Sequence, residues 1–127
     1  LGAALCNPGK ETWIIWGDGS AAYSLAEFDT FVRHGLPVIG VVGTDGSWAQ
    51  IAREQVEVLG TDLGCALRRT SYETVAEGYG GKGLLLERPE DIPAVLSEAK
   101  SLAQQGYPVL INALIGKTDF RKGSISM

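Results

Sequence analysis

Four apolar segments are spread along the chain, and each is rich in β-branched or large residues. None of them alternates strictly between apolar and polar positions. Continuous apolar runs are typical of strands that are covered on both faces, as in a parallel sheet between two layers of helices. The predicted strands are TWIIWG (12–17), PVIGVVG (37–43), KGLLLE (82–87) and YPVLINALIG (107–116).

Helical periodicity fills the intervals between these strands. Residues 25–35 and 90–106 each place their apolar side chains along one stripe. The second segment begins after a proline with two acidic residues and stops at a glycine, which suits the two ends of a helix. Weaker helices are predicted at 48–60 and 71–80. The stripe residues are Leu25, Phe28, Phe31 and Val32 in the first helix, and Ile92, Val95, Leu96, Ala99, Leu102 and Ala103 in the second.

Strands that alternate with helices across short, glycine-containing loops predict an α/β fold. We expect three layers: an open, mainly parallel sheet with helices on both faces and right-handed crossovers. A chain of 127 residues is about one domain in size. Its first residues, LGAALCNPGK, read as the last turns of a helix closed by Asn-Pro-Gly. We therefore expect a piece of a longer polypeptide, truncated on the N-terminal side of the fold.

Composition narrows the classes of function. A formal net charge of −4 argues against binding to nucleic acid or to an anionic membrane, because both need a basic face. Cys6 and Cys65 are too few for a disulfide scaffold or a four-cysteine zinc site, so we expect reduced structural thiols. No apolar run approaches the roughly 18 residues of a membrane span. We expect no membrane contact by this segment, and the compartment stays open.

Two aspartate-bearing turns follow successive predicted strands. Asp18 lies in GDGS directly after the first strand, and Asp45 lies in TDGSW directly after the second. Ligands bind in α/β sheets beyond the carboxyl ends of the strands. If the two strands are neighbours, the carboxylates come near each other and near helix N-termini, whose N–H groups favour an anion. This arrangement would suit Mg²⁺ joined to a phosphate, with carboxylate ligands and small residues that let backbone amides approach.

Taken alone, each turn is a weak signal, because Asp-Gly is one of the commonest turn pairs. A second aspartate-bearing turn at the end of the next strand would rarely arise by chance, so the pair favours a binding site over two incidental turns. Other motif matches fail on context. GYGGKG (78–83) leaves a helix and enters a strand, the reverse of the dinucleotide fingerprint, and IGKTD lacks the first glycine of a phosphate loop. The single histidine, His34, ends a helix, where a solvated or capping role is expected.

The two turns resemble the diphosphate-binding motif of thiamin-diphosphate enzymes, which is written G-D-G, then a spacer, then N-N. Beyond the motif, GDGSAAYSLAEFDTFVRHGLPVIGVVG, SWAQIAREQ and the closing strand resemble the cofactor domain of the acetolactate synthase, benzaldehyde lyase and 2-hydroxyacyl-CoA lyase group. The resemblance covers nearly the whole chain. It is strongest toward the animal acetolactate-synthase-like and 2-hydroxyacyl-CoA lyase members, in WAQIAREQVEVLG, EGYGGKG and LIGKTDFRKGSIS.

This resemblance implies a domain assignment and two cofactors. Residues 1–127 would be the C-terminal part of a diphosphate-anchoring domain, with the pyrimidine-binding and central domains outside this chain. The cofactors would be thiamin diphosphate and Mg²⁺, and no catalytic residue is expected in the fragment. The implied metal ligands are the Asp18 and Asp45 side chains and the Ser47 backbone carbonyl, and the implied cofactor-binding residues are Gly19, Ser20, Asp45, Ser47 and Trp48.

The resemblance also implies what the chain needs from elsewhere. The family's active site lies between this domain and the pyrimidine-binding domain of a second subunit, which donates the glutamate that activates the aminopyrimidine. A homodimer or homotetramer is therefore implied, and the fragment alone is expected to be inactive. The whole enzyme is expected to be a lyase or transferase of carbon–carbon bonds. The resemblance allows an intracellular full-length protein associated with the endoplasmic reticulum membrane.

One departure from the family pattern is Thr44-Asp45, where the motif reads Asn-Asn. The added negative charge predicts weakened cofactor binding, because a helix N-terminus returns only about 0.3–1 kcal/mol. No lysine or arginine is close in sequence to neutralise it. One alternative is therefore a non-catalytic cofactor-binding or structural module, and another is a flavodoxin-like domain with two incidental turns. The tail TDFRKGSISM (118–127) is expected either to be disordered or to fold over the site.

Overall fold

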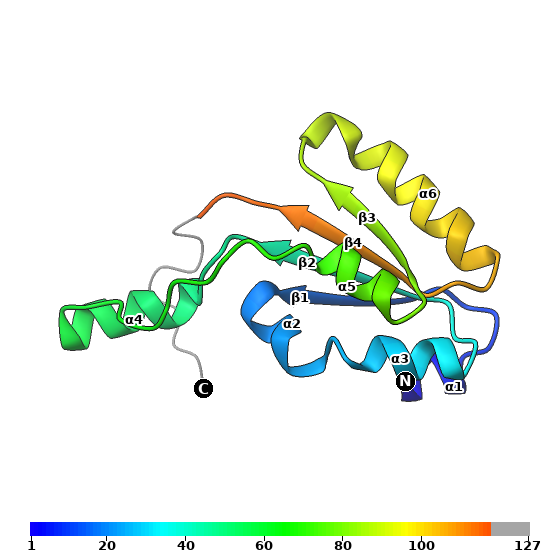
Figure 1. Ribbon diagram of the computed structural model, residues 1–127, viewed down its shortest axis with the longest axis horizontal. Helices are drawn as coiled ribbons and strands as arrows, with labels where there is room; N and C mark the ends of the chain where they lie inside the picture. Colours follow the sequence, from blue (N-terminus) through cyan, green and yellow to red (C-terminus); the bar gives the residue numbers. More distant parts are fainter. Residues whose placement is uncertain (118–127) are drawn as a thin grey trace.

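The computed structural model describes residues 1–117, which form a parallel sheet flanked by helices (Figure 1). The predicted α/β class and the four predicted strands are confirmed. In chain order the elements are α1 (Gly2–Cys6), β1 (Thr12–Gly17), α2 (Asp18–Ser24), α3 (Glu27–Arg33), β2 (Val38–Thr44), α4 (Ala49–Leu59), α5 (Tyr72–Gly78), β3 (Lys82–Leu86), the 3₁₀ turn η1 (Pro89–Asp91), α6 (Ile92–Gln104) and β4 (Val109–Leu114).

The sheet has the strand order β1-β2-β4-β3, and every neighbouring pair is parallel. The first two predicted strands are therefore neighbours. In the register, Gly17 pairs with Gly43, and Thr44 pairs with Leu114. The carboxyl ends of β1, β2 and β4 thus lie side by side at one end of the sheet, which we call its carboxyl edge. The loops into α2 and α4 begin there.

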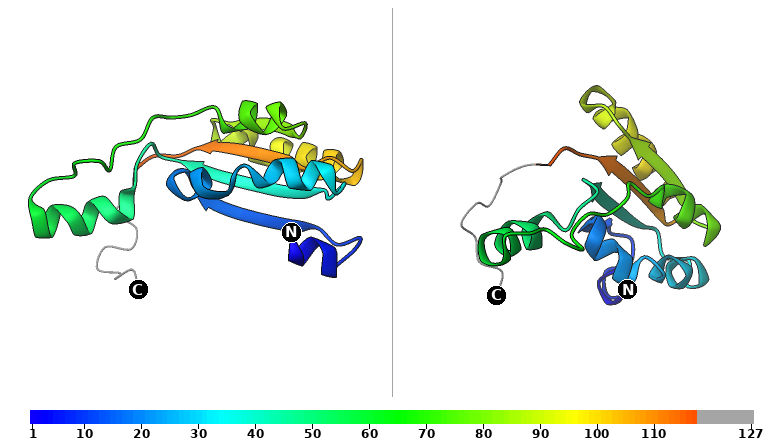
Figure 2. Two further views of the ribbon diagram at one scale, coloured as in Figure 1. Left: turned by 60° about the horizontal axis from the view of Figure 1, so that its bottom comes forward. Right: turned by 60° about the vertical axis from the view of Figure 1, so that its left-hand side comes forward.

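Helices cover both faces of the sheet and divide the core into two clusters (Figure 2). The first cluster joins α2, α3 and α5 to one face, and the second joins α6 to the other. Alternation along β2 and β4 supplies both faces from the same strands. The first cluster is Ala21, Leu25, Phe28, Phe31, Val38, Val42, Tyr72, Ala76 and Leu110, and the second is Ile39, Ala99, Ala103, Val109 and Ile111.

The expectation that every strand is covered on both faces holds only for the central strands β2 and β4. On the edge strand β1, Ile15 is 80% exposed, and on the edge strand β3, Leu85 is also exposed. A continuous apolar run therefore did not separate edge strands from central ones. On the second face of the sheet α6 is the covering helix, and its main contacts are with β2, β3 and β4. One helix is too narrow to cover all four strands, so part of the edge strand β1 stays exposed on this face.

Most of the observed helices lie where helices were predicted, but some of their bounds differ. The helix predicted at 25–35 is present as α3, and a separate short helix, α2, precedes it and begins at Asp18. The helices predicted at 48–60 and 71–80 are present as α4 and α5. In α6 the predicted stripe is correct except at its first residue, since Ile92 is exposed. It lies in the first turn, just after η1.

Helix α4 stands away from the sheet at its carboxyl edge (Figures 1 and 2), and none of its residues is buried. The chain returns from it to α5 through an extended segment, residues 60–71. GYGGKG is a helix end and turn, as predicted, with Gly80 at a φ of 94° between α5 and β3. In residues 1–117 no helix is long and apolar enough to cross a bilayer. The predicted alternatives for residues 118–127 lie outside the described residues.

Candidate functional site

A buried carboxylate joins the two aspartate-bearing turns. Gly17 ends β1 and caps α2, so that Asp18 is the first residue of the helix. Asp18 is buried, with only 2% of its surface exposed. Its Oδ1 accepts a hydrogen bond from the Gly19 amide at 3.0 Å, and its Oδ2 accepts one from the Gly46 amide at 2.8 Å. The first turn is therefore fastened directly to the second.

The second turn is held by Asp45 itself. Its Oδ1 accepts hydrogen bonds from the amide and from the hydroxyl of Ser47, both at 2.8 Å. Gly46 has a φ of +74°, and a Cβ at this position would lie 3.3 Å from the Leu67 carbonyl oxygen. Only glycine adopts this conformation without cost. The chain can therefore reverse sharply between β2 and α4 and bring the Gly46 amide to Asp18.

A third segment, which sequence reasoning missed, lines the second turn. The Trp48 amide donates to the Cys65 carbonyl at 2.8 Å, and the Leu67 amide donates to the Gly46 carbonyl at 2.9 Å. Between these bonds Ser47 forms an isolated antiparallel bridge with Ala66. The pairing is between residues distant in sequence and follows no apolar pattern, so no local signal predicts it.

The Trp48 ring packs on the first turn. A Cβ on Gly19 would lie 2.7 Å from carbons of this ring, which is closer than real contacts allow. The ring centroid of Tyr23 lies 5.9 Å from that of Trp48. Since the Trp48 amide is already paired with Cys65, the ring is the part of this residue that meets the first turn. Ser20, one residue beyond Gly19, is exposed.

A buried polar network lies beneath the second turn. The Thr44 hydroxyl donates to Asn112 Oδ1 at 2.6 Å, and both side chains are buried. Asn112 Nδ2 donates to the Thr70 carbonyl at 3.1 Å and to Glu73 Oε2 at 2.6 Å. The Thr44 side chain thus belongs to a network that joins β2, β4 and α5. Of the Thr44-Asp45 pair, Asp45 alone directs its side chain into the turn.

Tyr72 supports Asp18 from the core. Its hydroxyl donates to the backbone carbonyl of Asp18 at 3.4 Å. Burial raises the pKa of Tyr72 above its ordinary value of 10.0, and the negative charge of Asp18 raises this pKa further. A raised tyrosine pKa keeps the phenol neutral and able to donate. The residue that follows β1 is therefore held through its backbone as well as its side chain.

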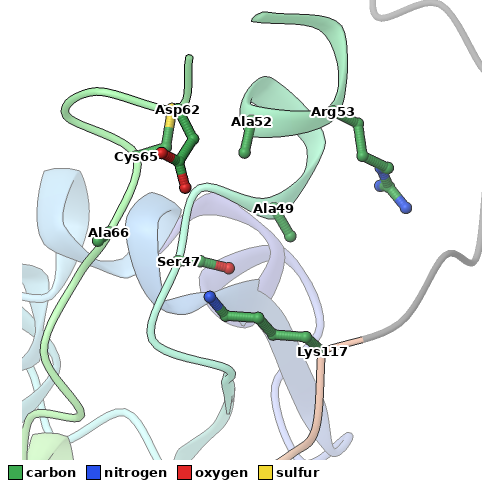
Figure 3. Close-up of a pocket in the computed structure, with 8 residues that line it drawn as sticks. All are labelled: Ser47, Ala49, Ala52, Arg53, Asp62, Cys65, Ala66 and Lys117. Carbon is green, nitrogen blue, oxygen red and sulfur yellow. The ribbon is translucent and has the colours of Figure 1, made fainter. Parts of the chain in front are cut away.

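A hollow of about 240 Å³ opens beside the second turn (Figure 3). In Figure 3 the Lys117 side chain reaches back from the end of β4 toward the Ser47 hydroxyl. This positive charge was missed because Lys117 is far from Asp45 in sequence. The lining residues are Ser47, Ala49, Ala52, Arg53, Asp62, Cys65, Ala66 and Lys117. Cys65 is a buried free thiol and Cys6 an exposed one, as expected for reduced cysteines.

The oxygen atoms at this end of the sheet suit a cation that is bound by protein side chains on one side and by an anion on the other. Within residues 1–117, Asp18 forms no ion pair with a lysine or arginine, although it is buried. A buried carboxylate ordinarily has a charged or metal partner. It has about four acceptor positions, of which the two amides use two. Nowhere in this part of the chain do three or more His, Cys, Asp or Glu side chains form a metal cluster.

The fold and this edge define an α/β ligand-binding domain, in which turns at the carboxyl ends of parallel strands carry the binding groups. Residues 1–113 match the family described as "Thiamine pyrophosphate enzyme, C-terminal TPP binding domain". The chain belongs to this family. The resemblance found in the sequence is thereby confirmed, and a generic flavodoxin-like domain is excluded as its class.

Individual relatives agree with this membership. The chain is 52% identical over 129 residues to "2-hydroxyacyl-CoA lyase 2" of Danio rerio, with 100% of this chain and 21% of the relative covered. It is 31% identical over 115 residues to "Probable acetolactate synthase" of Mycobacterium bovis, with 90% and 20% covered. The fold matches a thiamine diphosphate-dependent 4-hydroxybenzoylformate decarboxylase of Rhodococcus jostii with a TM-score of 0.79 at 25% identity, over 93% of this chain and 22% of that one. The chain thus spans about a fifth of the length of these relatives.

Proposed function

We propose that this domain anchors the diphosphate of thiamin diphosphate through Mg²⁺ at the carboxyl edge of its sheet. The observation that carries the proposal is Asp18, a buried carboxylate without an ion-pair partner in residues 1–117 that joins the two turns. Mg²⁺ is a hard cation that binds through one or two carboxylates together with phosphate oxygens and water. A site with two nearby acidic turns and no larger cluster of acidic, histidine or cysteine side chains among the described residues has this character.

The metal ligands we assign are the Asp18 and Asp45 side chains and the Ser47 carbonyl. Asp18 keeps acceptor positions beyond its two amide bonds, and so does Asp45 beyond its bonds to Ser47. The hydrogen bonds to Ser47 orient the Asp45 carboxylate before an ion arrives. Two diphosphate oxygens and a water would complete the octahedron that Mg²⁺ requires.

The diphosphate would lie against Gly19, Ser20, Asp45, Ser47 and Trp48. Gly19 lacks a Cβ, and this lets the Trp48 ring pack against the first turn. Ser20 is exposed there and offers a hydroxyl. Helix α4 begins directly after Trp48 and spans 11 residues, so its N-terminus adds favourable potential for an anion.

The chain would act as one part of a larger lyase or ligase of carbon–carbon bonds. When bound, thiamin diphosphate supplies an electron sink for breaking or forming a bond next to a carbonyl. This domain would hold the diphosphate end and fix its orientation, and we assign no catalytic residue to it. The named relatives suggest 2-hydroxyacyl-CoA cleavage or an acetolactate-synthase-like carboligation for the whole protein. A pyrimidine-binding domain from a second subunit would complete the active site, so residues 1–127 alone would be inactive.

Calorimetric titration of the full natural polypeptide with thiamin diphosphate, at fixed Mg²⁺, tests the proposal. Asp18→Asn removes the charge of the carboxylate and should weaken binding by more than about tenfold. Asp29→Asn is the matched control, because Asp29 is an exposed partner of Arg33 on α3. No binding by the natural protein at millimolar cofactor, or equal affinities for the two variants, would contradict the proposal.

The Thr44-Asp45 pair favours one second candidate, a cofactor-binding module that has lost catalysis. Asp45 places a carboxylate where the family pattern has an amide, next to a ligand that is already anionic. Asp45→Asn in the full polypeptide distinguishes the two candidates. Tighter cofactor binding with no turnover before or after the change supports the module, whereas a fall in turnover supports the enzyme.

A further inference from the structure

The acidic turn after β2 is flanked by two cations that come from distant parts of the chain. Arg69 belongs to the segment that returns from α4, and Lys117 follows β4. The Arg69 Cγ lies 3.6 Å from the position that a Cβ on Gly46 would occupy. Lys117 lines the hollow beside Ser47 and extends toward the Ser47 hydroxyl (Figure 3). Two cationic residues therefore lie next to the second turn, Arg69 beside Gly46 and Lys117 beside Ser47.

Arg69 also holds the segment that leads to Lys117. The Arg69 Nη2 donates to the Ile115 carbonyl at 3.1 Å, and the Ile115 amide donates to the Thr44 carbonyl at 3.1 Å. The segment that leads to Lys117 is thus tied to the last residue of β2 and to the returning segment. Without these bonds, an exposed lysine on an irregular segment would have no preferred direction.

We propose that Lys117 is a further anion-binding residue, which contacts a terminal oxygen of the diphosphate, and that Arg69 is its positioning residue. The inference rests on the proposed function. A lysine ammonium is a compact point charge that binds phosphate oxygens well, whereas the arginine fork holds backbone carbonyls and planar anions. The pair would offset the charge that Asp45 adds, so the Thr44-Asp45 departure need not weaken cofactor binding.

The test compares lysine variants of the full natural polypeptide by calorimetric titration with thiamin diphosphate at fixed Mg²⁺. At low salt, Lys117→Met should raise the Kd about threefold to tenfold, since one exposed charge contact is lost. Lys117→Arg should stay within about twofold of the natural protein, because the charge is kept. Lys10→Met is the matched control, because Lys10 is exposed and lines a different hollow, next to the start of β1.

Salt and a second variant separate charge from structure. The effect of Lys117→Met should shrink at half-molar salt, where the Debye length is only a few ångströms. Arg69→Met should weaken binding in the same direction, and it should add little to Lys117→Met in the double variant if Arg69 acts through Lys117. Additive losses would overturn the positioning role of Arg69.

The outcomes also distinguish this inference from the function on which it rests. If the natural protein binds the cofactor and Lys117→Met behaves like Lys10→Met, the anion-binding role is overturned and the proposed function stands. A loss that is equal in Lys117→Arg, or that does not change with salt, also overturns it. If the natural protein binds no thiamin diphosphate, both ideas fall together.

Discussion

The buried pair of Thr44 and Asn112 permits a prediction whose size can be worked out from the structure. Thr44→Val keeps the shape of the side chain and removes the hydroxyl that donates to Asn112 Oδ1 at 2.6 Å. Asn112 Nδ2 remains engaged with Thr70 and Glu73, so its amide cannot simply turn over to find a new donor. Its oxygen would be left buried without a partner.

A buried acceptor without a hydrogen bond costs about 1–3 kcal/mol. Since 1.4 kcal/mol is about a factor of ten, local opening at the ends of β2 and β4 should become about 5- to 150-fold more frequent. Amide hydrogen exchange, read by mass spectrometry on peptides that span 38–48 and 109–115, measures this opening. The Ile115 amide is a useful probe, because it donates to the Thr44 carbonyl.

The control for this prediction is Thr30→Val on α3. The Thr30 hydroxyl accepts a hydrogen bond from Arg33 Nη2 at 3.2 Å at the surface, where water can replace it. Exchange at the ends of β2 and β4 should not change in this variant. Unchanged exchange in Thr44→Val would refute the reasoning, since it would mean that the network does not hold the strand ends together.

Three further predictions concern the same edge of the sheet. Gly19→Ala should displace the Trp48 ring, which a Cβ would approach to 2.7 Å, and should cost about 1–3 kcal/mol of folding stability. It should also lower cofactor affinity; indole fluorescence reports the ring displacement, denaturant unfolding the stability and titration calorimetry the affinity. Gly46→Ala forces a side chain to a φ of +74° and should cost about 1–2 kcal/mol, seen as faster amide exchange at 44–48. The Tyr72 pKa is raised by burial and then by Asp18, so the stability that it contributes is present below the unfolded pKa and is lost as the pH rises through the folded one. Alkaline titration of tyrosinate absorbance should show a late-ionising phenol that is missing in Tyr72→Phe.

Much of the fold could be predicted because its determinants are local. Apolar runs marked all four strands, and every longer helix followed from periodicity and from glycine or proline at its ends, whereas the short helix α2 was not predicted. The approach of the turns at Asp18 and Asp45 was predicted on the condition that β1 and β2 are neighbours, and the structure meets this condition. The exposure of Ile15 could not be predicted, because a run of apolar residues does not say whether a strand lies at an edge.

The surroundings of the two turns could not be predicted for a different reason. Ala66, Arg69 and Lys117 come next to the second turn only through the path of the folded chain. Thr44 was interpreted as a departure within the binding motif, whereas its side chain is part of the buried network with Asn112. Neither composition nor spacing encodes these long-range contacts.

If the domain binds Mg²⁺ as proposed, the hydrogen bond from the Gly46 amide to Asp18 has a consequence for the rate at which the ion binds. Because this bond already fixes the separation of the two turns, an incoming ion has no loop to draw closed and little conformational entropy to remove. The slow step would then be the ion's own loss of water, which Mg²⁺ gives up reluctantly. Association should accordingly depend weakly on solvent viscosity, and a faster-dehydrating divalent ion such as Mn²⁺ should enter sooner.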